Sequence, residues 1–214
     1  MPGDPYALAR EAMVEHQILA RGVRDERVLA AMRGVPRHLF VPPGYERAAY
    51  DDMPLPIGSG QTISQPYIVA QMTALLEPGP RDRVLEIGAG SGYQAAILSL
   101  LCERVITIER LPEVAEVARA NLARVGASNV EVHVADGTLG WPASAPYAGI
   151  LVTAATPVVP EPLLAQLSDG GRLVAPVGGR EIQELVRVRR QGDRLVQEPA
   201  GAVRFVPLIG EHGW

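Results

Sequence analysis

Three glycines stand at alternate positions in the segment 84–93, whose sequence is Val-Leu-Glu-Ile-Gly-Ala-Gly-Ser-Gly-Tyr. An apolar run leads into them and a helix-like segment follows, as where a buried parallel strand meets a helix around a nucleotide-like ligand. The spacing matters because dinucleotide-binding loops use G-x-G-x-x-G. Gly88, Gly90 and Gly92 form G-x-G-x-G, and Tyr93 stands where the third glycine of the dinucleotide pattern would be. The pattern therefore disfavours a nicotinamide dehydrogenase.

Three acidic residues accompany this loop. Glu86 lies two residues before the first glycine, where a carboxylate would repel a pyrophosphate but not a cationic cofactor. Glu109 ends the second predicted strand, where it can accept hydrogen bonds from both hydroxyls of a ribose. Asp136 and Gly137 follow the third, where an acid can accept from an exocyclic amine such as adenine N6. A cation, a ribose and an adenine together describe S-adenosylmethionine, so we predict a site for that cofactor.

Each of these features also has a purely structural interpretation. A glycine-rich turn often only joins a strand tightly to a helix. A single acid at a strand end, such as Asp136, is often a helix cap. The prediction of a cofactor site therefore depends on the combination, because all three features stand in the right order at successive strand ends.

The loop of residues 54–66 precedes the helix that leads into the first strand of this series, so we expect it to lie over the carboxyl edge of the sheet as a lid. Ser64 or Thr62 could present a hydroxyl to a substrate there. Ser64 is also a good N-cap, since Gln-Pro follows it at a helix start. The two roles are compatible, because a cap position has free N–H groups nearby.

Other catalytic chemistries lack their residues. There is no G-x-S-x-G elbow, and the four histidines have no partner acid at a set spacing, so we predict structural or surface roles for them. No HExxH or CxxC motif indicates a metal. Every one of the 20 basic residues is arginine, which excludes a Schiff-base or P-loop lysine. The histidines are His16, His38, His133 and His212.

The elements that must position these residues follow from hydrophobic periodicity. Helices are expected at 6–20, 26–33, 67–76, 92–101, 112–125 and 160–167. Strands are expected at 83–88, 104–109, 130–134, 149–154 and 172–177. Asp25 is the expected N-cap of the second helix, and residues 36–66 are expected to be irregular but packed. Beyond Gly178, residues 185–190 and 194–197 predict a hairpin, and 202–206 a last strand.

This alternation predicts an α/β fold: a doubly wound, mostly parallel, Rossmann-like sheet with an N-terminal helical extension and a C-terminal antiparallel hairpin. We expect one domain over residues 1–214. It divides into N-terminal helices and a lid loop (1–66), a cofactor-binding core (67–178), and a hairpin with its tail (179–214).

Composition limits the classes of partner. The chain has 214 residues, 47% of them hydrophobic and 21% charged, with a formal net charge of -4. Bulk attraction to nucleic acid or to an anionic membrane is therefore not expected, nor is a membrane span. Residues 1–6 lack the features of a signal peptide, and the single Cys102 is expected to be buried and reduced. We expect a cytoplasmic monomer.

The chain resembles protein-L-isoaspartate O-methyltransferases of the bacterial type, nearly from end to end. The segment Gly60-Gln-Thr-Ile-Ser-Gln-Pro66 is highly specific to that family, whereas the glycine motif indicates only a class I methyltransferase. Further matching segments are Val35–Pro42, Pro54–Pro66, Val84–Tyr93, Ala145–Tyr147 with Val152–Ala155, Gln166–Leu167 with Gly170–Val174, and Arg204–Leu208.

The resemblance implies methyl transfer from S-adenosylmethionine, which leaves S-adenosylhomocysteine, to the α-carboxyl of L-isoaspartyl residues in damaged proteins and peptides. The ester then closes to a succinimide that reopens partly to normal aspartate. Ser64 matches the family's active-site serine. The positions that match cofactor contacts are Thr62, Ile63, Glu86, Gly88, Gly90, Gly92, Glu109, Asp136 and Gly137. By position and resemblance, Ile57, Gln61, Ser64, Val206 and Leu208 are expected to contact the substrate.

Two positions depart from the family pattern. Ala148 stands where many members have Asp, and Ile209 where some have a polar residue. Two other functions share the cofactor motif: a class I methyltransferase for a small molecule, which has no need of residues 61–66, and a binding module without catalysis. Loss of Glu109 or of the glycines would favour the binding module, and all of them are present.

Overall fold

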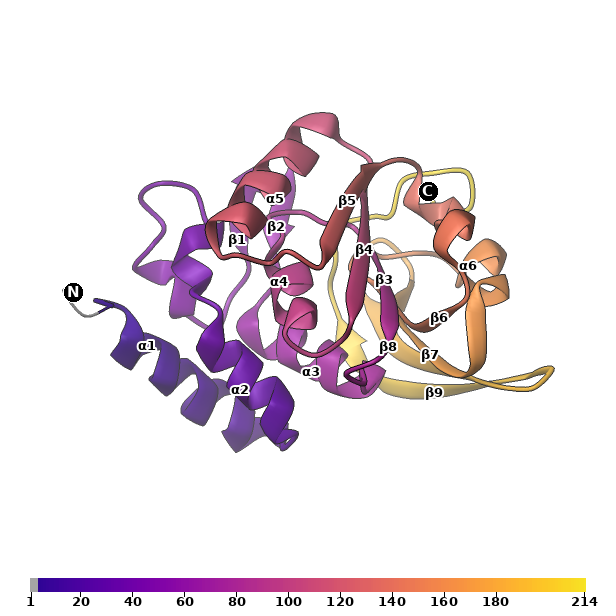
Figure 1. The fold of residues 1–214 in the computed structure, drawn as a ribbon, viewed down its shortest axis with the longest axis horizontal. Helices are drawn as coiled ribbons and strands as arrows, with labels where there is room; N and C mark the ends of the chain where they lie inside the picture. Colours follow the sequence, from indigo (N-terminus) through magenta and orange to yellow (C-terminus); the bar gives the residue numbers. More distant parts are fainter. Residues whose placement is uncertain (1–3) are drawn as a thin grey trace.

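The computed structural model describes residues 4–214 and contains a seven-stranded sheet in the order β5-β4-β3-β6-β7-β8-β9. The strands are β3 (Arg83–Ile87), β4 (Arg104–Glu109), β5 (Val130–Val134), β6 (Tyr147–Val152), β7 (Leu167–Gly178), β8 (Gln183–Gln191) and β9 (Arg194–Val203). Strands β3 to β7 pair in parallel, and β8 and β9 are antiparallel. Helices α4 and α5 lie on one side of β3–β5 and α6 on the other (Figure 1). The predicted doubly wound α/β fold with a C-terminal hairpin is confirmed.

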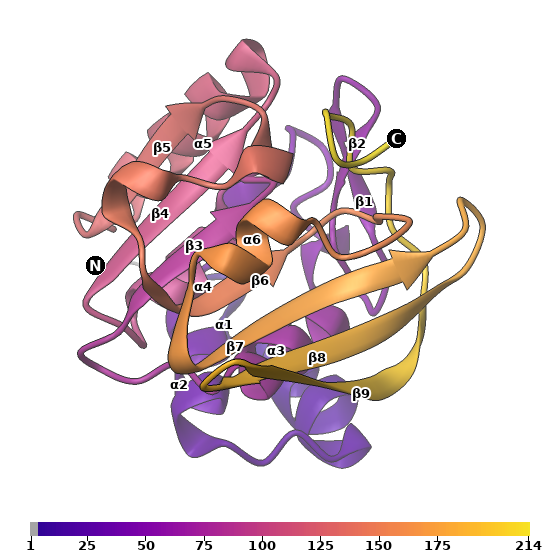
Figure 2. The same ribbon diagram turned by 90° about the vertical axis from the view of Figure 1, so that its right-hand side faces the viewer.

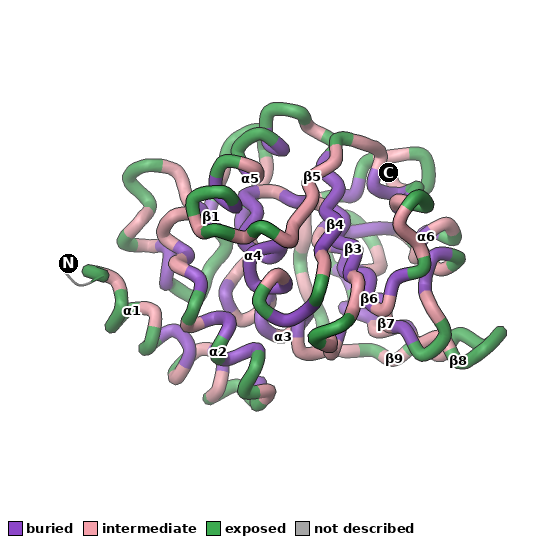
Figure 3. The backbone as a smooth tube through the Cα atoms, viewed as in Figure 1, coloured by how far each residue is buried: buried purple, intermediate pink, exposed green. Residues whose placement is uncertain are grey.

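Successive residues of β3 face two different cores, because side chains alternate across a strand. Val84 packs in a cluster with the N-terminal helices, α3 and α4. Leu85 and Ile87 pack in a second cluster on the opposite face, which also contains Leu163 of α6. The central strands are correspondingly buried along most of their length (Figure 3). The carboxyl end of β3 is thus held from both sides, and the glycine loop that follows starts from a rigid base.

The helices begin with a continuous helical segment that changes type along its length. The first predicted helix is observed as α1, a π-helical turn η1 and a 3-10 turn η2. Asp25 caps α2 as predicted, because its Oδ1 accepts from the N–H groups of Arg27 and Val28 at 2.9 and 3.4 Å. Within residues 4–214, no helix is long and apolar enough to cross a membrane. The helical elements up to residue 50 are α1 (Ala7–Ala12), η1 (Met13–Ile18), η2 (Leu19–Arg21), α2 (Glu26–Gly34), η3 (Arg37–Phe40) and η4 (Ala48–Tyr50), and the later ones are α3 (Pro66–Leu76), α4 (Tyr93–Ser99), α5 (Pro112–Arg124), η5 (Gly137–Leu139), η6 (Pro142–Ser144) and α6 (Glu161–Ala165).

Residues 36–66 are packed, as expected, but they are more regular than the sequence indicates. Phe40, Tyr50 and Leu55 are each at most 4% exposed. A two-stranded antiparallel hairpin, β1 (Leu55–Gly58) and β2 (Gln61–Ile63), occupies part of the segment. Hydrophobic periodicity does not predict this hairpin, because each of its strands is too short to show alternation. Figure 2 shows this hairpin and the C-terminal tail at the same end of the sheet.

The predicted last strand at 202–206 is wrong. Strand β9 runs without interruption over residues 194–203, and the chain leaves the sheet after it. Residue Pro207 then forms an isolated parallel bridge with Ala155, just beyond β6. Ala155 N–H donates to Val206 O at 2.8 Å, and Leu208 N–H donates to Ala155 O. These hydrogen bonds hold the tail across the carboxyl ends of the strands.

Candidate active site

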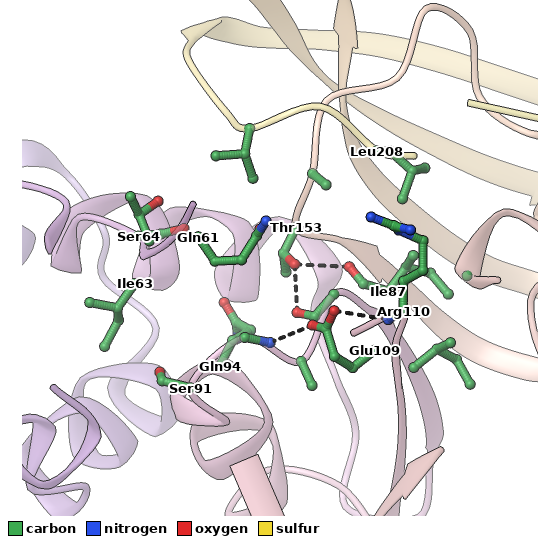
Figure 4. Close-up of a pocket in the computed structure, with 18 of the residues that line it drawn as sticks. Gln61, Ile63, Ser64, Ile87, Ser91, Gln94, Glu109, Arg110, Thr153 and Leu208 are labelled. Atoms are coloured by element: carbon green, nitrogen blue, oxygen red, sulfur yellow. Dashed lines mark hydrogen bonds between the residues drawn. The ribbon is translucent and has the colours of Figure 1, made fainter. Parts of the chain in front are cut away.

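A cavity opens at the carboxyl ends of β3, β4 and β6, and we call it the central cavity. Its walls come from the β2–α3 connection, the glycine loop, the start of the β4–α5 connection and the C-terminal tail. Ser64 and Gln61 lie on one side and Leu208 on the other, with Glu109 and Thr153 between them (Figure 4). The predicted site residues on its lining are Gln61, Thr62, Ile63, Ser64, Gly88, Gly90, Glu109, Gly137, Val206 and Leu208. Segments far apart in the sequence are thus brought to one place.

The glycine loop is held closely against its neighbours. Gly88 has φ +96°, and an added Cβ would lie 2.4 Å from Thr153 Oγ1. That hydroxyl is itself placed within 2.8 Å of Ile87 O and 2.7 Å of Gly88 O. A side chain at Gly88 would therefore meet both an unfavourable backbone conformation and a fixed atom. The close packing keeps the backbone at the floor of the cavity free of side chains.

Replacing Gly88 with alanine should lower the free energy of unfolding by roughly 2–5 kcal/mol, the sum of a left-handed conformation and a steric overlap. Gly22→Ala is the matched control, since Gly22 has φ +95° with nothing within 4 Å of the added Cβ. Urea denaturation measures the loss of stability in both variants. The loss in Gly22→Ala reports the backbone strain alone, and the additional loss in Gly88→Ala reports the overlap with Thr153. Equal losses would show that Thr153 moves aside without cost.

Glu109 connects the glycine loop to the end of β4. Its Oε2 accepts from Gly90 N–H at 3.0 Å, and its Oε1 accepts from the N–H groups of Arg110 and Leu111 at 2.8 and 3.1 Å. A carboxylate offers about four acceptor positions, so one remains on Oε2. Glu109 is 8% exposed and lines the central cavity. This free position fits the predicted contact with a ribose hydroxyl.

Asp136 does not line the cavity, and its carboxylate is used in the capping role. Its Oδ1 accepts from Thr138 N–H and Oγ1 at 2.9 and 2.7 Å, and its Oδ2 accepts from Glu211 N–H at 2.8 Å. Burial alone would raise the pKa of Asp136, but the hydrogen bonds from Glu211 and Thr138 outweigh it and lower that pKa. Asp136 therefore holds the C-terminal tail in place, while Gly137 beside it faces the cavity. A contact of Asp136 with an adenine amine remains a prediction.

Glu86 stands behind the cavity wall. Its side chain is fully buried and absent from the cavity lining, and both carboxyl oxygens lack a hydrogen-bond partner within residues 4–214. Burial raises the pKa of Glu86 to about 8, so the group is largely neutral at pH 7. In the absence of a ligand it therefore adds little negative charge to the cavity, and its contact with a cationic cofactor remains a prediction. The distinction from dinucleotide sites depends on glycine spacing alone.

Two other predicted residues also stand behind the cavity wall. Gly92 begins α4 with φ +86°, and a Cβ there would lie 3.2 Å from Ala118 O of α5. Its role in the structure is to let α4 and α5 approach each other. Ile57 reaches from β1 to within 3.6 Å of the position of a Cβ on Gly90, so it covers the outside of the glycine loop.

Ser64 does not cap helix α3. The cap position belongs to Gln65, which makes no side-chain cap hydrogen bond, so that hypothesis for Ser64 is wrong. Among the residues described, the Ser64 hydroxyl has no hydrogen-bond partner, whereas its carbonyl accepts from Arg37 Nη2 at 2.7 Å. The hydroxyl is thus free for a ligand.

Ser64 also lines a second depression, which we call the side groove, on the other side of the β2–α3 connection. Thr62 and Ser64 are the two residues shared by the central cavity and the side groove. Most of the rest of the groove comes from α3, from the edge strand β9 and from the start of the C-terminal tail, and Arg21, Pro54 and Ile182 complete it. The two spaces therefore adjoin at the serine.

Some lining residues of the central cavity were not predicted. Ser91, Gln94, Arg110 and Thr153 are among them. Thr153 directly follows β6, the strand next to β3, so its position at a strand end was a usable signal. Ser91 lies within the glycine motif and Arg110 directly follows Glu109, so these positions also had a local signal, whereas Gln94 had none. Neither lining includes a histidine, and residues 4–214 contain no cluster of groups suited to a metal.

Comparison with known proteins agrees with this geometry. The sequence model of the family described as Protein-L-isoaspartate(D-aspartate) O-methyltransferase (PCMT) matches residues 8–213. A Protein-L-isoaspartate O-methyltransferase of Methanoregula boonei is 65% identical over 210 residues, covering 98% of this chain and 97% of the relative. That of Methanoculleus marisnigri is 61% identical over 214 residues, covering 100% and 97%.

Solved structures show the same relationship. A protein-L-isoaspartate O-methyltransferase superposes with a TM-score of 0.87 at 30% identity, covering 95% of this chain and 67% of the other. A putative protein-L-isoaspartate O-methyltransferase from Plasmodium falciparum, in complex with S-adenosyl-L-homocysteine, shares the fold with a TM-score of 0.79 at 22% identity, covering 94% and 98%. The chain therefore belongs to the protein-L-isoaspartate(D-aspartate) O-methyltransferase family.

Proposed function

We propose that this protein transfers the methyl group of S-adenosylmethionine to the α-carboxylate of L-isoaspartyl residues, with Ser64 holding that carboxylate in line for the transfer. The observation that carries the proposal is the position of Ser64, whose residue borders both the central cavity and the side groove. A ligand bound in the central cavity and a ligand bound in the side groove therefore meet at Ser64.

The central cavity is suited to the methyl donor. Bare backbone at Gly88 and Gly90 lets a ligand lie close, and Gly137 lines the cavity as well. The free acceptor position on Glu109 suits a ribose hydroxyl. When bound, the cofactor supplies an electrophilic methyl group on a sulfonium sulfur. Thr62 and Ile63 border the cavity on the lid side and restrict access of water.

The chemistry requires little from the side chains apart from alignment. The α-carboxylate of an isoaspartyl residue is already ionised at neutral pH, so no general base has to remove a proton. A carboxylate oxygen forms the new bond to the methyl carbon while the carbon–sulfur bond breaks and its electron pair stays on sulfur. Aligning the two partners can contribute roughly 7–11 kcal/mol to lowering the barrier. The Ser64 hydroxyl donates to the carboxylate and is not itself modified.

The side groove is suited to the peptide that carries the damaged residue. Ala200 to Val203 line it from β9, the last strand of the sheet. Ala200 O accepts from Gln71 Nε2 at 3.1 Å and Gly201 N–H donates to Glu184 Oε1 at 3.0 Å, so a peptide would pair with the remaining main-chain groups of this edge. An extended peptide can add to such an edge through main-chain hydrogen bonds, which tolerate any side-chain sequence. On the opposite wall, Tyr67 carries the Arg21 guanidinium 3.5 Å above its ring centroid. The groove thus combines backbone recognition with a broad, partly apolar wall.

Under the same proposal, the protein acts as a monomer, is located in the cytoplasm and does not require nucleic acid. Residues of one chain line both the central cavity and the side groove. The net charge is -4, and burial raises the pKa of the Cys102 thiol to about 12, which suits a permanently reduced cysteine.

The experiment that tests this function compares methyl transfer to an isoaspartyl peptide with transfer to its normal aspartyl twin. Preference for the isoaspartyl form is expected, because only there is the α-carboxylate free, since the peptide bond runs through the side-chain carboxyl instead. Equal transfer to both peptides, or transfer only to a small acceptor, would identify a methyltransferase of another specificity. Cofactor binding without transfer to any acceptor would identify a binding module.

Glu109→Ala is expected to weaken S-adenosylmethionine binding by about 10- to 100-fold, because hydrogen bonds to a charged group contribute about 1.5–3 kcal/mol. Part of the loss comes from the N–H groups of Gly90, Arg110 and Leu111, which lose their acceptor. Glu109→Gln keeps one acceptor oxygen and should lie between the two. Titration calorimetry measures the affinity, and an unchanged Kd for Glu109→Ala would rule out the ribose assignment.

A further inference from the structure

Arg37 is the largest fully buried side chain of the described residues, and it carries an ionic group with no acidic partner. It is 0% exposed, and no carboxylate among residues 4–214 lies within ion-pair distance of it. Burial lowers the pKa of Arg37, but arginine has the highest pKa of the side chains and keeps its proton in a folded protein. The molecule therefore holds an unpaired cation in its interior, which is costly to bury.

The guanidinium is fixed by dipoles and by an aromatic ring instead of a charge. Its Nε donates to Ala49 O and its Nη2 donates to Ser64 O, both at 2.7 Å. Its central carbon lies 4.8 Å from the ring centroid of Tyr93, the first residue of α4 after the glycine loop. A planar fork can make such contacts together, whereas the point charge of lysine cannot reproduce them.

These contacts join four segments of the chain through one side chain. Arg37 belongs to η3, Ala49 to η4, Ser64 to the β2–α3 connection and Tyr93 to α4. The Ser64 hydroxyl has no hydrogen bond of its own in residues 4–214, so its direction depends on the backbone that carries it. The bond to the Ser64 carbonyl, together with the pairing of Ile63 with Leu55 in the β1–β2 hairpin, therefore restrains how this backbone is turned toward the cavity.

We propose that Arg37 is a positioning residue that orients Ser64 by holding its carbonyl against η4 and α4. Apolar packing in place of the guanidinium would leave the carbonyl oxygens of Ala49 and Ser64 without a donor, so Arg37 also supports the fold. A guanidinium that grips the peptide group of the proposed carboxylate-binding residue has a use that apolar packing lacks. This inference rests on the proposed function of Ser64.

The test is a double-mutant cycle of Arg37→Lys and Ser64→Ala, with kcat measured at saturating peptide and cofactor. In the native background, Arg37→Lys should lower kcat by about 10-fold or more, because small displacements of an aligned group are costly. In the Ser64→Ala background, the same change should alter kcat by less than about twofold, because the group that it orients is gone. Cofactor affinity should stay within about threefold of the native value throughout.

Leu163→Ala is the matched control for lost stability, because Leu163 is fully buried in the core on the opposite face of the sheet. At a temperature well below unfolding, this variant should keep the native kcat although its melting temperature falls.

If Arg37→Lys does not fold, Arg37→Gln takes its place in the cycle, because it removes the buried charge and keeps hydrogen-bond donors. Multiplicative effects of the two changes, or a native kcat in a folded Arg37 variant, would overturn the positioning role. Full activity of Ser64→Ala alone would instead overturn the proposed function of the serine.

Discussion

Ser64→Ala is expected to lower kcat by on the order of 100-fold while leaving the affinity for S-adenosylmethionine nearly unchanged. The hydroxyl borders both the central cavity and the side groove, and it makes no hydrogen bond to another described residue. Its removal therefore costs the fold little but leaves the acceptor carboxylate without a partner that aims it. Single-turnover methylation of an isoaspartyl peptide measures the rate, and calorimetry measures the cofactor affinity.

Ser99→Ala provides the control for loss of a serine hydroxyl. Ser99 lies at the end of α4, where its Oγ donates to Ala96 O, and it does not line either the cavity or the groove. Native kcat is expected for this variant. A native rate for Ser64→Ala would mean that the lid backbone alone aligns the carboxylate, and a large loss of cofactor affinity would place Ser64 on the cofactor instead of the acceptor.

Glu86 should make the folded protein less stable as the pH rises from about 5 to about 8. Burial raises its pKa from 4.5 to about 8; the neighbouring Thr107 hydroxyl opposes this in part, and the carboxylate of Glu109 adds repulsion that raises the pKa. In this window the folded state holds a proton that the unfolded state has lost, so raising the pH favours unfolding. Over the whole window the contribution amounts to roughly 3–5 kcal/mol, since each pKa unit corresponds to about 1.4 kcal/mol.

Glu86→Gln tests this directly, because glutamine does not ionise. The variant should lose this downward slope and should be more stable than the native protein at about pH 9. Urea denaturation at intervals between about pH 5 and about pH 9 measures both properties. Glu103→Gln, a change at an exposed glutamate near β4, should keep the native slope. A native-like slope in Glu86→Gln would show that the buried carboxyl is solvated or paired.

The elements of the sheet could be predicted because their signals are local. Strand β3 is an apolar run that ends at a glycine, and α5 has a clear helical stripe, so both were expected close to where they lie. Asp25 illustrates the same point, since a cap acts on N–H groups only two and three residues away. Short elements such as β1 and β2 lack that local signal and depend on packing from both sides.

The site was only partly predictable, because some of its features are properties of the enclosure and not of the residue type. Asp136 has a residue pattern suited to an adenine contact, yet it bonds to Glu211, 75 residues later in the chain. The charge at Glu86 is another case, because desolvation depends on what covers the side chain. Arg37 has no motif of its own, and only the folded chain places its guanidinium against Ser64 O.

The fold class, the cofactor loop and the family follow from the sequence, because glycine spacing, strand-end acids and the segment 60–66 are patterns of neighbouring residues. Which groups face the cavity, which carry charge and which support its wall depends on the folded chain. Burial, desolvation and long-range hydrogen bonds arise between segments that are distant in the sequence, so no local pattern reports them. Ser64 thus carries a sequence signature, whereas its free hydroxyl and its anchored carbonyl are consequences of packing.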